Sequence, residues 1–257
     1  MLFYVISHKR LPYETAPPFQ MIYTGSTETL PGEMRDSEGD SIAARNPCFS
    51  ELTGQYWAWK NVFPNLPAGT VVGFLHYRRY FNFGRVPDAP LSRLLNPMAG
   101  EEALRLLGQG YDAIIPEPFV MLKKRKLSFS LFGRRVKIPL PQGPHSLREQ
   151  YRDAHVEADL EAAIALLPEE HRAPFERHIE GNRLHAFNIY VAPKETLDRY
   201  FNALFPWLLA LDDSLDLSQR SVYQARVCAF LAERFASYYF TTKLKVVQAP
   251  IVKLENV

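Results

Sequence analysis

The chain has 257 residues, of which 47% are hydrophobic and 23% are charged. These values are typical of a globular protein and exclude disordered, collagen-like and coiled-coil chains. A formal net charge of +2 does not by itself imply a nucleic-acid or membrane partner. We expect a single domain over residues 1–257.

The amino terminus and the cysteines favour a reduced, cytoplasmic setting. The apolar run from Met1 to Ile6 is too short for a signal peptide. No run approaches the ~20 apolar residues that span a membrane. Cys48 and Cys228 lie 180 residues apart, without a CxxC pair, so the sequence carries no disulfide framework or zinc-ribbon spacing.

Short apolar strands alternate with helical patterns, which predicts an α/β fold. The polar ends of such strands are where α/β proteins bind ligands. The expected strands are residues 2–7, 20–24, 71–77, 111–115 and 185–191. The expected helices are residues 46–63, 146–167, 194–212 and 219–239, of which 194–240 would form a helical carboxy-terminal cap.

The first helix carries an apolar stripe. Asn46 is expected as its N-cap, with Pro47 at the first helical position. One face of this helix would pack on a sheet, because its apolar residues recur at intervals of three and four. The residues of this stripe are Phe49, Leu52, Tyr56, Trp59 and Phe63. Trp57 and Lys60 fall outside the stripe.

The most unusual polar string is His76-Tyr77-Arg78-Arg79-Tyr80-Phe81, directly after the apolar run from Val71. If the strand continues, His76, Arg78 and Tyr80 share one face. Two guanidiniums beside an imidazole suit a diphosphate, because arginine matches phosphate oxygens bidentately. The alternative is a structural arginine pair that bridges carboxylates of the core.

Polar residues at other predicted strand and helix ends are further candidates. His8 and Lys9 follow the first strand, where a nucleotide would lie, although such pairs are also common on surfaces. Asp40 would accept hydrogen bonds from ribose or sugar hydroxyls, or would belong to a simple turn. For Asn46, helix capping is favoured over a role in catalysis.

The predicted helix from residue 146 opens with a capping box formed by Ser146 and Glu149. Tyr151, His155 and Asp159 recur every fourth residue and would line one face. They would flank a sugar, with His155 as acid or base. The alternative is an amphipathic rim without catalytic function.

Residues 118–148 contain no acidic side chain and carry eight lysines and arginines. Apolar residues alternate with these charges, and Gly133 would form the turn of a basic hairpin insertion. Residues 123–137 would contact an anionic membrane surface or a lipid-diphosphate acceptor. A solvated loop is the alternative, and nucleic acid is less favoured because the rest of the chain is acidic.

The sequence contains no HExxH, GxSxG, P-loop or GxGxxG motif, which argues against zincins, α/β-hydrolases, P-loop NTPases and simple dehydrogenases. No DxD metal motif stands at a strand end, since Asp212, Asp213 and Asp216 lie in a predicted helix tail. We therefore expect no metal ligands and no requirement for a divalent metal.

These blocks together resemble bacterial capsule, O-antigen and exopolysaccharide glycosyltransferases of the domain of unknown function 4422 type, some of which are galactofuranosyltransferases. The blocks ELT-YWAWKN from Glu51 and HYRRYF from His76 are specific, and the later ones, such as Phe187-Asn188-Ile189-Tyr190, are loose. The resemblance implies a GT-A-like mixed sheet flanked by helices, and transfer of a hexosyl unit from a UDP-sugar to a glycan or lipid-linked acceptor.

The expected roles combine this resemblance with the residue patterns. The acceptor would contact Tyr151 and Asn188, and the catalytic candidates are His76, His155 and Asp159. The residues expected to bind the donor are His8, Lys9, Asp40, Asn46, Trp57, Lys60, Arg78 and Arg79. The protein would be cytoplasmic and peripheral at the inner face of the membrane. The rival functions are a non-catalytic sugar-nucleotide or glycan-binding module and a nucleic-acid-binding protein.

Overall fold

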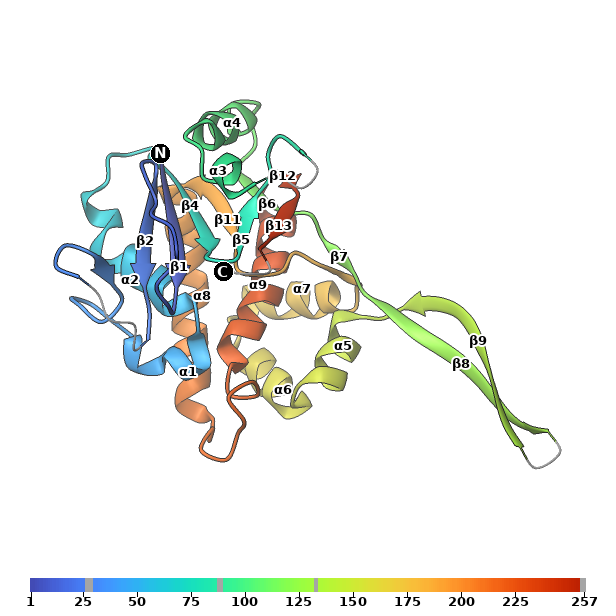
Figure 1. Ribbon diagram of the computed structural model, residues 1–257. Coiled ribbons are helices and arrows are strands. Elements are labelled where there is room, and N and C mark those ends of the chain that lie inside the picture. Colours follow the sequence, from blue (N-terminus) through green and yellow to red (C-terminus); the bar gives the residue numbers. More distant parts are fainter. Residues whose placement is uncertain (26–29, 87–89, 132–133, 255–257) are drawn as a thin grey trace.

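The computed structural model describes residues 1–25, 30–86, 90–131 and 134–254, which form a mixed sheet flanked by helices (Figure 1). The expected α/β class is therefore confirmed. The main path of the nine-stranded sheet is β12 (Val246–Ala249), β6 (Ala113–Pro116), β11 (Tyr190–Pro193), β4 (Val71–His76), β1 (Leu2–Ser7), β2 (Phe19–Tyr23) and β3 (Met34–Arg35). From β4 the sheet continues through β5 (Arg79–Phe81) and β13 (Ile251–Lys253).

Helices cover both faces of this sheet. The smaller group is α3 (Leu91–Leu94) and α4 (Met98–Leu107). The larger group is α1 (Asn46–Phe49), α2 (Leu52–Asn61), α5 (Leu147–Ala154), α6 (Glu157–Leu166), α7 (Glu169–Ile179), α8 (Lys194–Ser214) and α9 (Val227–Lys243). Within this larger group, α8 contacts α2, α6 and α9, so the long helices of the expected carboxy-terminal cap join the main core.

Strand β1 shows why the sheet is buried on both sides. Tyr4 and Ile6 point into the core beneath the larger helix group, and Phe3 and Val5 point into the core on the other face. All four are at most 2% exposed. A strand covered on both faces is apolar throughout, rather than alternating, which explains the continuous run that begins the sequence.

Four of the five predicted strands differ from the structure in their bounds. Two of them, 20–24 and 111–115, are displaced only by one or two residues at each end, to β2 and β6. The other two differences affect residues singled out in the sequence. The strand predicted for residues 71–77 ends at His76, and the chain turns at Tyr77 and Arg78 into β5. The alternating arrangement expected for His76, Arg78 and Tyr80 is therefore wrong. The strand predicted for residues 185–191 is also wrong in its bounds, because Phe187 and Asn188 adopt positive φ angles and β11 begins only at Tyr190.

The predicted first helix is interrupted at Ser50, whose φ angle is 50°. Arg45, not Asn46, is the N-cap residue of α1, and its side chain makes no capping hydrogen bond. All five residues of the predicted stripe are buried, as expected, but so is every other residue from Leu52 to Trp59, including Trp57. The expectation of one buried face is therefore wrong, because α2 is covered on all sides. The last predicted helix begins at Val227 instead of Gln219, because turns occupy much of the preceding segment.

The helix predicted for residues 146–167 consists of α5 and α6. Its capping box at Ser146 and Glu149 is confirmed. The helix then breaks at His155, which has an extended backbone, and Gln224 Nε2 donates to the last carbonyl of α5, Ala154 O, at 3.0 Å. The expectation that Tyr151, His155 and Asp159 share one helix face is therefore wrong.

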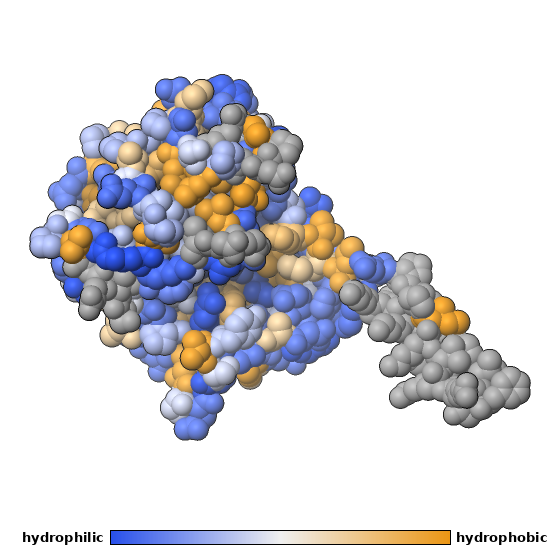
Figure 2. Space-filling model, viewed as in Figure 1, coloured by the Kyte–Doolittle hydropathy of each residue, from blue (hydrophilic) through white to orange (hydrophobic). Residues whose placement is uncertain are grey.

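Strands β8 (Leu122–Leu131) and β9 (Arg134–Pro144) pair as an antiparallel ribbon that projects from the body (Figure 1). Apolar side chains gather where this ribbon leaves the body (Figure 2), and Phe119, Val120 and Leu122 are each 49% exposed there. Gly133, and the side chains of residues 124–137, lie outside the part of the chain that is described. Among the described residues, no helix is long and apolar enough to cross a membrane.

We predict that Gly73→Ala lowers the free energy of unfolding by about 1–3 kcal/mol, since overpacking a filled core has this cost. A Cβ atom at Gly73, in the central strand β4, would lie 2.3 Å from Phe3 Cδ1. The control is Gly100→Ala in α4, where the nearest atom would be at 3.4 Å and helix propensity improves. Equal urea midpoints for Gly73→Ala and the parent protein would contradict the packing described here.

Candidate functional site

A polar cavity of about 460 Å³ opens at the carboxyl ends of β1 and β4. These strands are parallel neighbours, with Ile6 opposite His76, so the residues that follow them meet at one edge of the sheet. We call this cavity the cationic pocket. Its lining residues are Ile6, His8, Thr24, Asn46, Ser50, Glu51, His76, Tyr77, Arg78, Arg79 and Arg226.

Arg78, in the turn between β4 and β5, and Arg79, the first residue of β5, both line the cationic pocket. Arg78 Nε donates to Leu254 O at 3.4 Å, and the Arg79 guanidinium lies 4.2 Å from the ring centre of Phe187. Arg79 Nε is buried and has no hydrogen-bond partner among the described residues. Among the described residues, neither arginine contacts a carboxylate directly. Burial lowers the pKa of Arg79, but the nearby charges of Glu233 and Glu51 raise it against this effect, so a structural role for Arg79 stays open.

Arg226, immediately before α9, supplies a third guanidinium. Its Nε donates to Ser50 Oγ at 2.8 Å, and its Nη2 lies 3.8 Å from Glu51 Oε2. The sequence does not mark Arg226 as a site residue, because it lies within the helix predicted for residues 219–239 and belongs to no motif. Three guanidiniums face one carboxylate, so the pocket suits a ligand with more than one negative charge.

Both histidines of the pocket favour the neutral form. Burial, and then the charge of Arg79, lower the pKa of His76 to about 3. Burial and Lys9 lower the pKa of His8. His76 Nδ1 accepts a hydrogen bond from the backbone N–H of Arg78 at 3.3 Å and lies 3.4 Å from Arg79 Nη1. A neutral imidazole therefore fixes the turn that carries both arginines.

The structure brings five predicted site residues into the cationic pocket: His8, Asn46, His76, Arg78 and Arg79. Lys9 borders it, with Nζ 5.3 Å from the ring centre of Tyr77, which also lines the pocket. Asn46 Nδ2 donates to Ser50 O and to Thr53 Oγ1, each at 3.0 Å. The Asn46 side chain thus spans the break between α1 and α2 instead of capping a helix.

Three predicted donor-binding residues lie elsewhere. Asp40 is exposed, accepts a hydrogen bond from Tyr56 Oη at 3.0 Å, and belongs to a turn tied to α2. Trp57 is buried, donates to Glu38 O and lines a separate cavity of about 420 Å³. Lys60 lies 3.7 Å from the ring centre of Trp59, beside a third cavity.

Tyr151, His155 and Asp159 lie in the α5–α6 region and do not line the cationic pocket. Tyr151 is fully buried, and the His155 ring stacks on Phe230 at 4.1 Å. Burial, and then Arg234, lower the pKa of His155 to about 4, so it would be a weak base at neutral pH. Asp159 forms a bidentate ion pair with Arg220 at 2.9 and 3.0 Å, which accounts for both carboxylate oxygens.

Asn188, predicted to contact the acceptor, lies directly behind the cationic pocket. It is 2% exposed, and its Nδ2 donates to Glu51 Oε1 at 2.8 Å and to Ala229 O at 3.2 Å. The preceding residue, Phe187, donates its backbone N–H to Glu233 Oε1 at 2.8 Å while its ring contacts Arg79. This turn therefore supports both the carboxylate and one guanidinium of the pocket.

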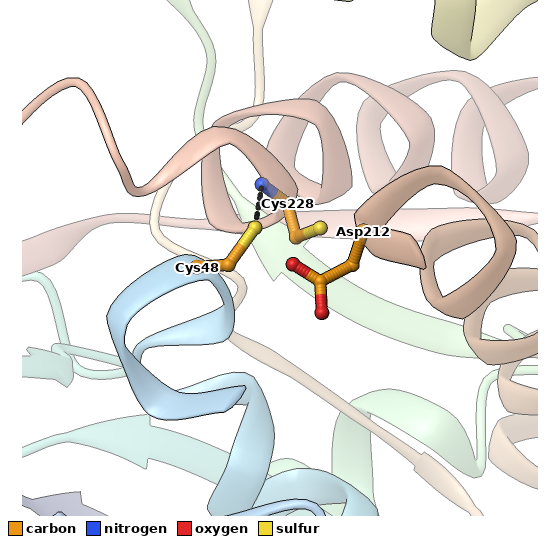
Figure 3. Close-up of side chains that lie close together, drawn as sticks. All are labelled: Cys48, Asp212 and Cys228. Carbon is orange, nitrogen blue, oxygen red and sulfur yellow. Dashed lines mark hydrogen bonds between the residues drawn. The ribbon is translucent and has the colours of Figure 1, made fainter. Parts of the chain in front are cut away.

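Within the described part of the chain, one group of three potential metal ligands meets: Cys48, Asp212 and Cys228 (Figure 3). It lies where α1, α8 and α9 pack together. Cys48 Sγ accepts the backbone N–H of Cys228 at 3.4 Å, and Arg45 pairs with Asp212 at 2.7 Å. Both cysteines are free and buried, and burial raises the pKa of Cys228, which favours its protonated thiol.

The chain is an α/β protein with a polar cavity at the carboxyl ends of two parallel strands, which is where α/β proteins commonly bind ligands. A solved structure described as the apo structure of a WbbM bifunctional glycosyltransferase shares the fold, with a TM-score of 0.75 and 23% sequence identity. The likeness covers 99% of this chain and 45% of that one, so this chain spans less than half of that protein. The mixed sheet is thus GT-A-like, as expected.

The model of a family described as a domain of unknown function (DUF4422) matches residues 3–244. The chain belongs to this family, which confirms the resemblance drawn from its sequence blocks. No curated protein matches the chain.

We predict that His76 makes the protein less stable in acid. The pKa of His76 is about 3 in the folded protein and about 6.5 when unfolded, so the unfolded state binds more protons between these values. The stability contributed by neutral His76 is present above pH 6.5 and is lost as the pH falls towards 3. Urea unfolding at pH 7 and pH 4.5 should show a larger loss for the parent protein than for His76→Gln. Equal losses would contradict the prediction.

Proposed function

We propose that the protein is a glycosyltransferase that moves a hexosyl unit from a UDP-sugar to a glycan or lipid-linked acceptor in the synthesis of a cell-surface polysaccharide. The observation that carries this proposal is the set of Arg78, Arg79 and Arg226 around one cavity, with neither Arg78 nor Arg79 in direct contact with a carboxylate of the described residues. Partly buried guanidiniums without such partners suit the diphosphate of a sugar nucleotide. The GT-A-like fold adds support.

In the proposed reaction, the bond between the anomeric carbon and the diphosphate oxygen breaks, and the diphosphate leaves with the electron pair. The guanidiniums of the cationic pocket would stabilise the negative charge that develops there. The acceptor oxygen forms the new bond to the anomeric carbon and loses its proton to a base. Of the three sequence candidates for that base, His76, His155 and Asp159, His76 is the one that lines the pocket. Burial lowers its pKa to about 3 and makes it a weak base, so we assign no residue to this proton transfer.

In related enzymes a divalent cation stabilises the leaving diphosphate. The cationic pocket does not fit such an ion, because its lining offers one carboxylate and two imidazoles among three guanidiniums. The proposed transfer therefore relies on side-chain cations, and no step is assigned to a metal.

The setting proposed for this reaction is the cytoplasmic face of a membrane. Its support is the sequence of residues 123–137, whose positive charges would be attracted to anionic lipid. A lipid-linked acceptor would then be presented to a protein already held at the surface.

We predict that Arg78→Ala, Arg79→Ala and Arg226→Ala each weaken UDP binding by about 10- to 100-fold, since a hydrogen bond to a charged group contributes about 1.5–3 kcal/mol. Lysine at the same positions should restore part of the affinity, because it keeps the charge but not the fork. The control is Arg105→Ala, which removes an exposed arginine paired with Glu102. Unchanged affinities by calorimetry would contradict the diphosphate site.

The function itself is tested by incubating the purified protein with a panel of UDP-sugars and oligosaccharide acceptors, with and without a chelator. We expect UDP release and a glycosylated product in both conditions. Donor binding without product would instead indicate a non-catalytic sugar-nucleotide-binding module. Loss of activity in chelator would contradict the proposed use of side-chain cations.

A further inference from the structure

Glu51 is the single carboxylate among the residues that line the cationic pocket. It lies at the start of α2, between Ser50 and the buried residues of that helix. Its side chain is 11% exposed, so the little surface it keeps belongs to this pocket. A carboxylate among guanidiniums that bind a diphosphate would weaken that binding by charge repulsion. Diphosphate binding therefore does not explain why Glu51 lines the pocket.

Hydrogen bonds on the side away from the cavity hold Glu51 in position. Oε1 accepts a hydrogen bond from Asn188 Nδ2 at 2.8 Å, and Gln55 Nε2 donates to Asn188 O at 2.7 Å. Asn188 holds this place with a φ angle of 51°, in the left-handed region that non-glycine residues rarely adopt. Backbone strain of this kind persists where the surrounding structure requires it and is concentrated at functional sites.

The carboxylate oxygen Oε2 of Glu51 can still accept hydrogen bonds from a ligand in the cavity. Oε2 lies 3.8 Å from Arg226 Nη2, which is an ion-pair distance rather than a hydrogen bond, and Arg226 directs its Nε to Ser50 Oγ. Among the described residues, no hydrogen bond to Oε2 is made. An ionised carboxylate has about four lone-pair sites, so Glu51 can accept hydrogen bonds from ligand hydroxyls.

We propose that Glu51 recognises the sugar of the donor and selects neutral hydroxylated hexoses against hexuronic acids. This inference rests on the proposed function. With the diphosphate on the guanidiniums, the sugar attached to it lies in the same cavity, within reach of Glu51. The carboxylate accepts hydrogen bonds from sugar hydroxyls, and it repels a sugar that carries a carboxylate of its own. Both effects favour binding of the neutral hexose over the hexuronic acid.

Calorimetry with matched ligands tests this role without an acceptor. The probes are UDP, UDP-galactose with UDP-galacturonate, and UDP-glucose with UDP-glucuronate, in which each pair differs only at carbon 6. We expect the protein to bind at least one neutral sugar nucleotide about tenfold or more tightly than its uronate partner. Glu51→Gln keeps the size and the bond from Asn188 but removes the charge.

In Glu51→Gln the two kinds of sugar nucleotide should change in opposite directions. Affinity for the neutral hexose should fall about tenfold, affinity for the uronate should rise, and affinity for UDP should be unchanged or higher. The control is Glu195→Gln, which removes the same charge at the start of α8, where Glu195 accepts the backbone N–H of Gly69 at 2.9 Å. This control should leave all affinities unchanged.

Two outcomes would overturn the proposed role of Glu51 without contradicting the proposed function. One is a fall in UDP affinity as large as that for UDP-hexose, which would make Glu51 a structural partner of Arg226. The other is an unchanged ratio between hexose and uronate in Glu51→Gln. If neither UDP nor any of the sugar nucleotides binds the parent protein, the proposed function fails, and this inference fails with it.

Discussion

The parallel pairing of β1 with β4 is the constraint on which the site depends. With Ile6 opposite His76, the segments that leave the two strands must emerge at the same edge of the sheet. His8 and the turn at Tyr77 and Arg78 therefore meet, although they are far apart in the chain. The carboxy-terminal strand β13 then pairs with β5, and Leu254 donates its backbone N–H to Arg78 O at 2.9 Å, which fixes the turn from the other side.

Backbone strain accompanies the charged groups of the cationic pocket. Ser50, Phe187 and Asn188 all have positive φ angles, and their contacts are with Arg226, Arg79 and Glu51 respectively. Each strained residue thus supports a different charged side chain. A structure that holds its charges in this way before the ligand arrives has less to reorganise when the ligand binds.

Local patterns in the sequence predict much of the fold. The bounds of β1, the start of α8, the capping box at Ser146 and the burial of the apolar residues of α1 and α2 all follow from spacings within a few residues. The breaks at Ser50 and His155 do not, because they depend on partners from distant segments, such as the Arg226 guanidinium and the Gln224 amide. Tertiary contacts override helical propensity at both positions.

The candidate site also combines residues that local sequence patterns predict with residues that only tertiary contacts bring together. His76, Arg78 and Arg79 stand out because three charged or titratable groups follow an apolar strand, and the structure places them in one pocket. Arg226 joins them from a distant segment that the sequence predicts only as part of a packing helix, and Cys48 meets Cys228 despite the 180 residues between them. Such long-range neighbours arise from the packing of α1 against α9, which no short window of sequence reveals.

A crystal structure of the protein with bound UDP is the most direct test of whether the cationic pocket binds the diphosphate of a sugar nucleotide. We expect both phosphates at the carboxyl ends of β1 and β4, with oxygens within hydrogen-bond distance of the guanidiniums of Arg78, Arg79 and Arg226. Phosphates bound instead in the cavity beside Trp57 or the one beside Lys60, with the cationic pocket free of ligand, would contradict this expectation.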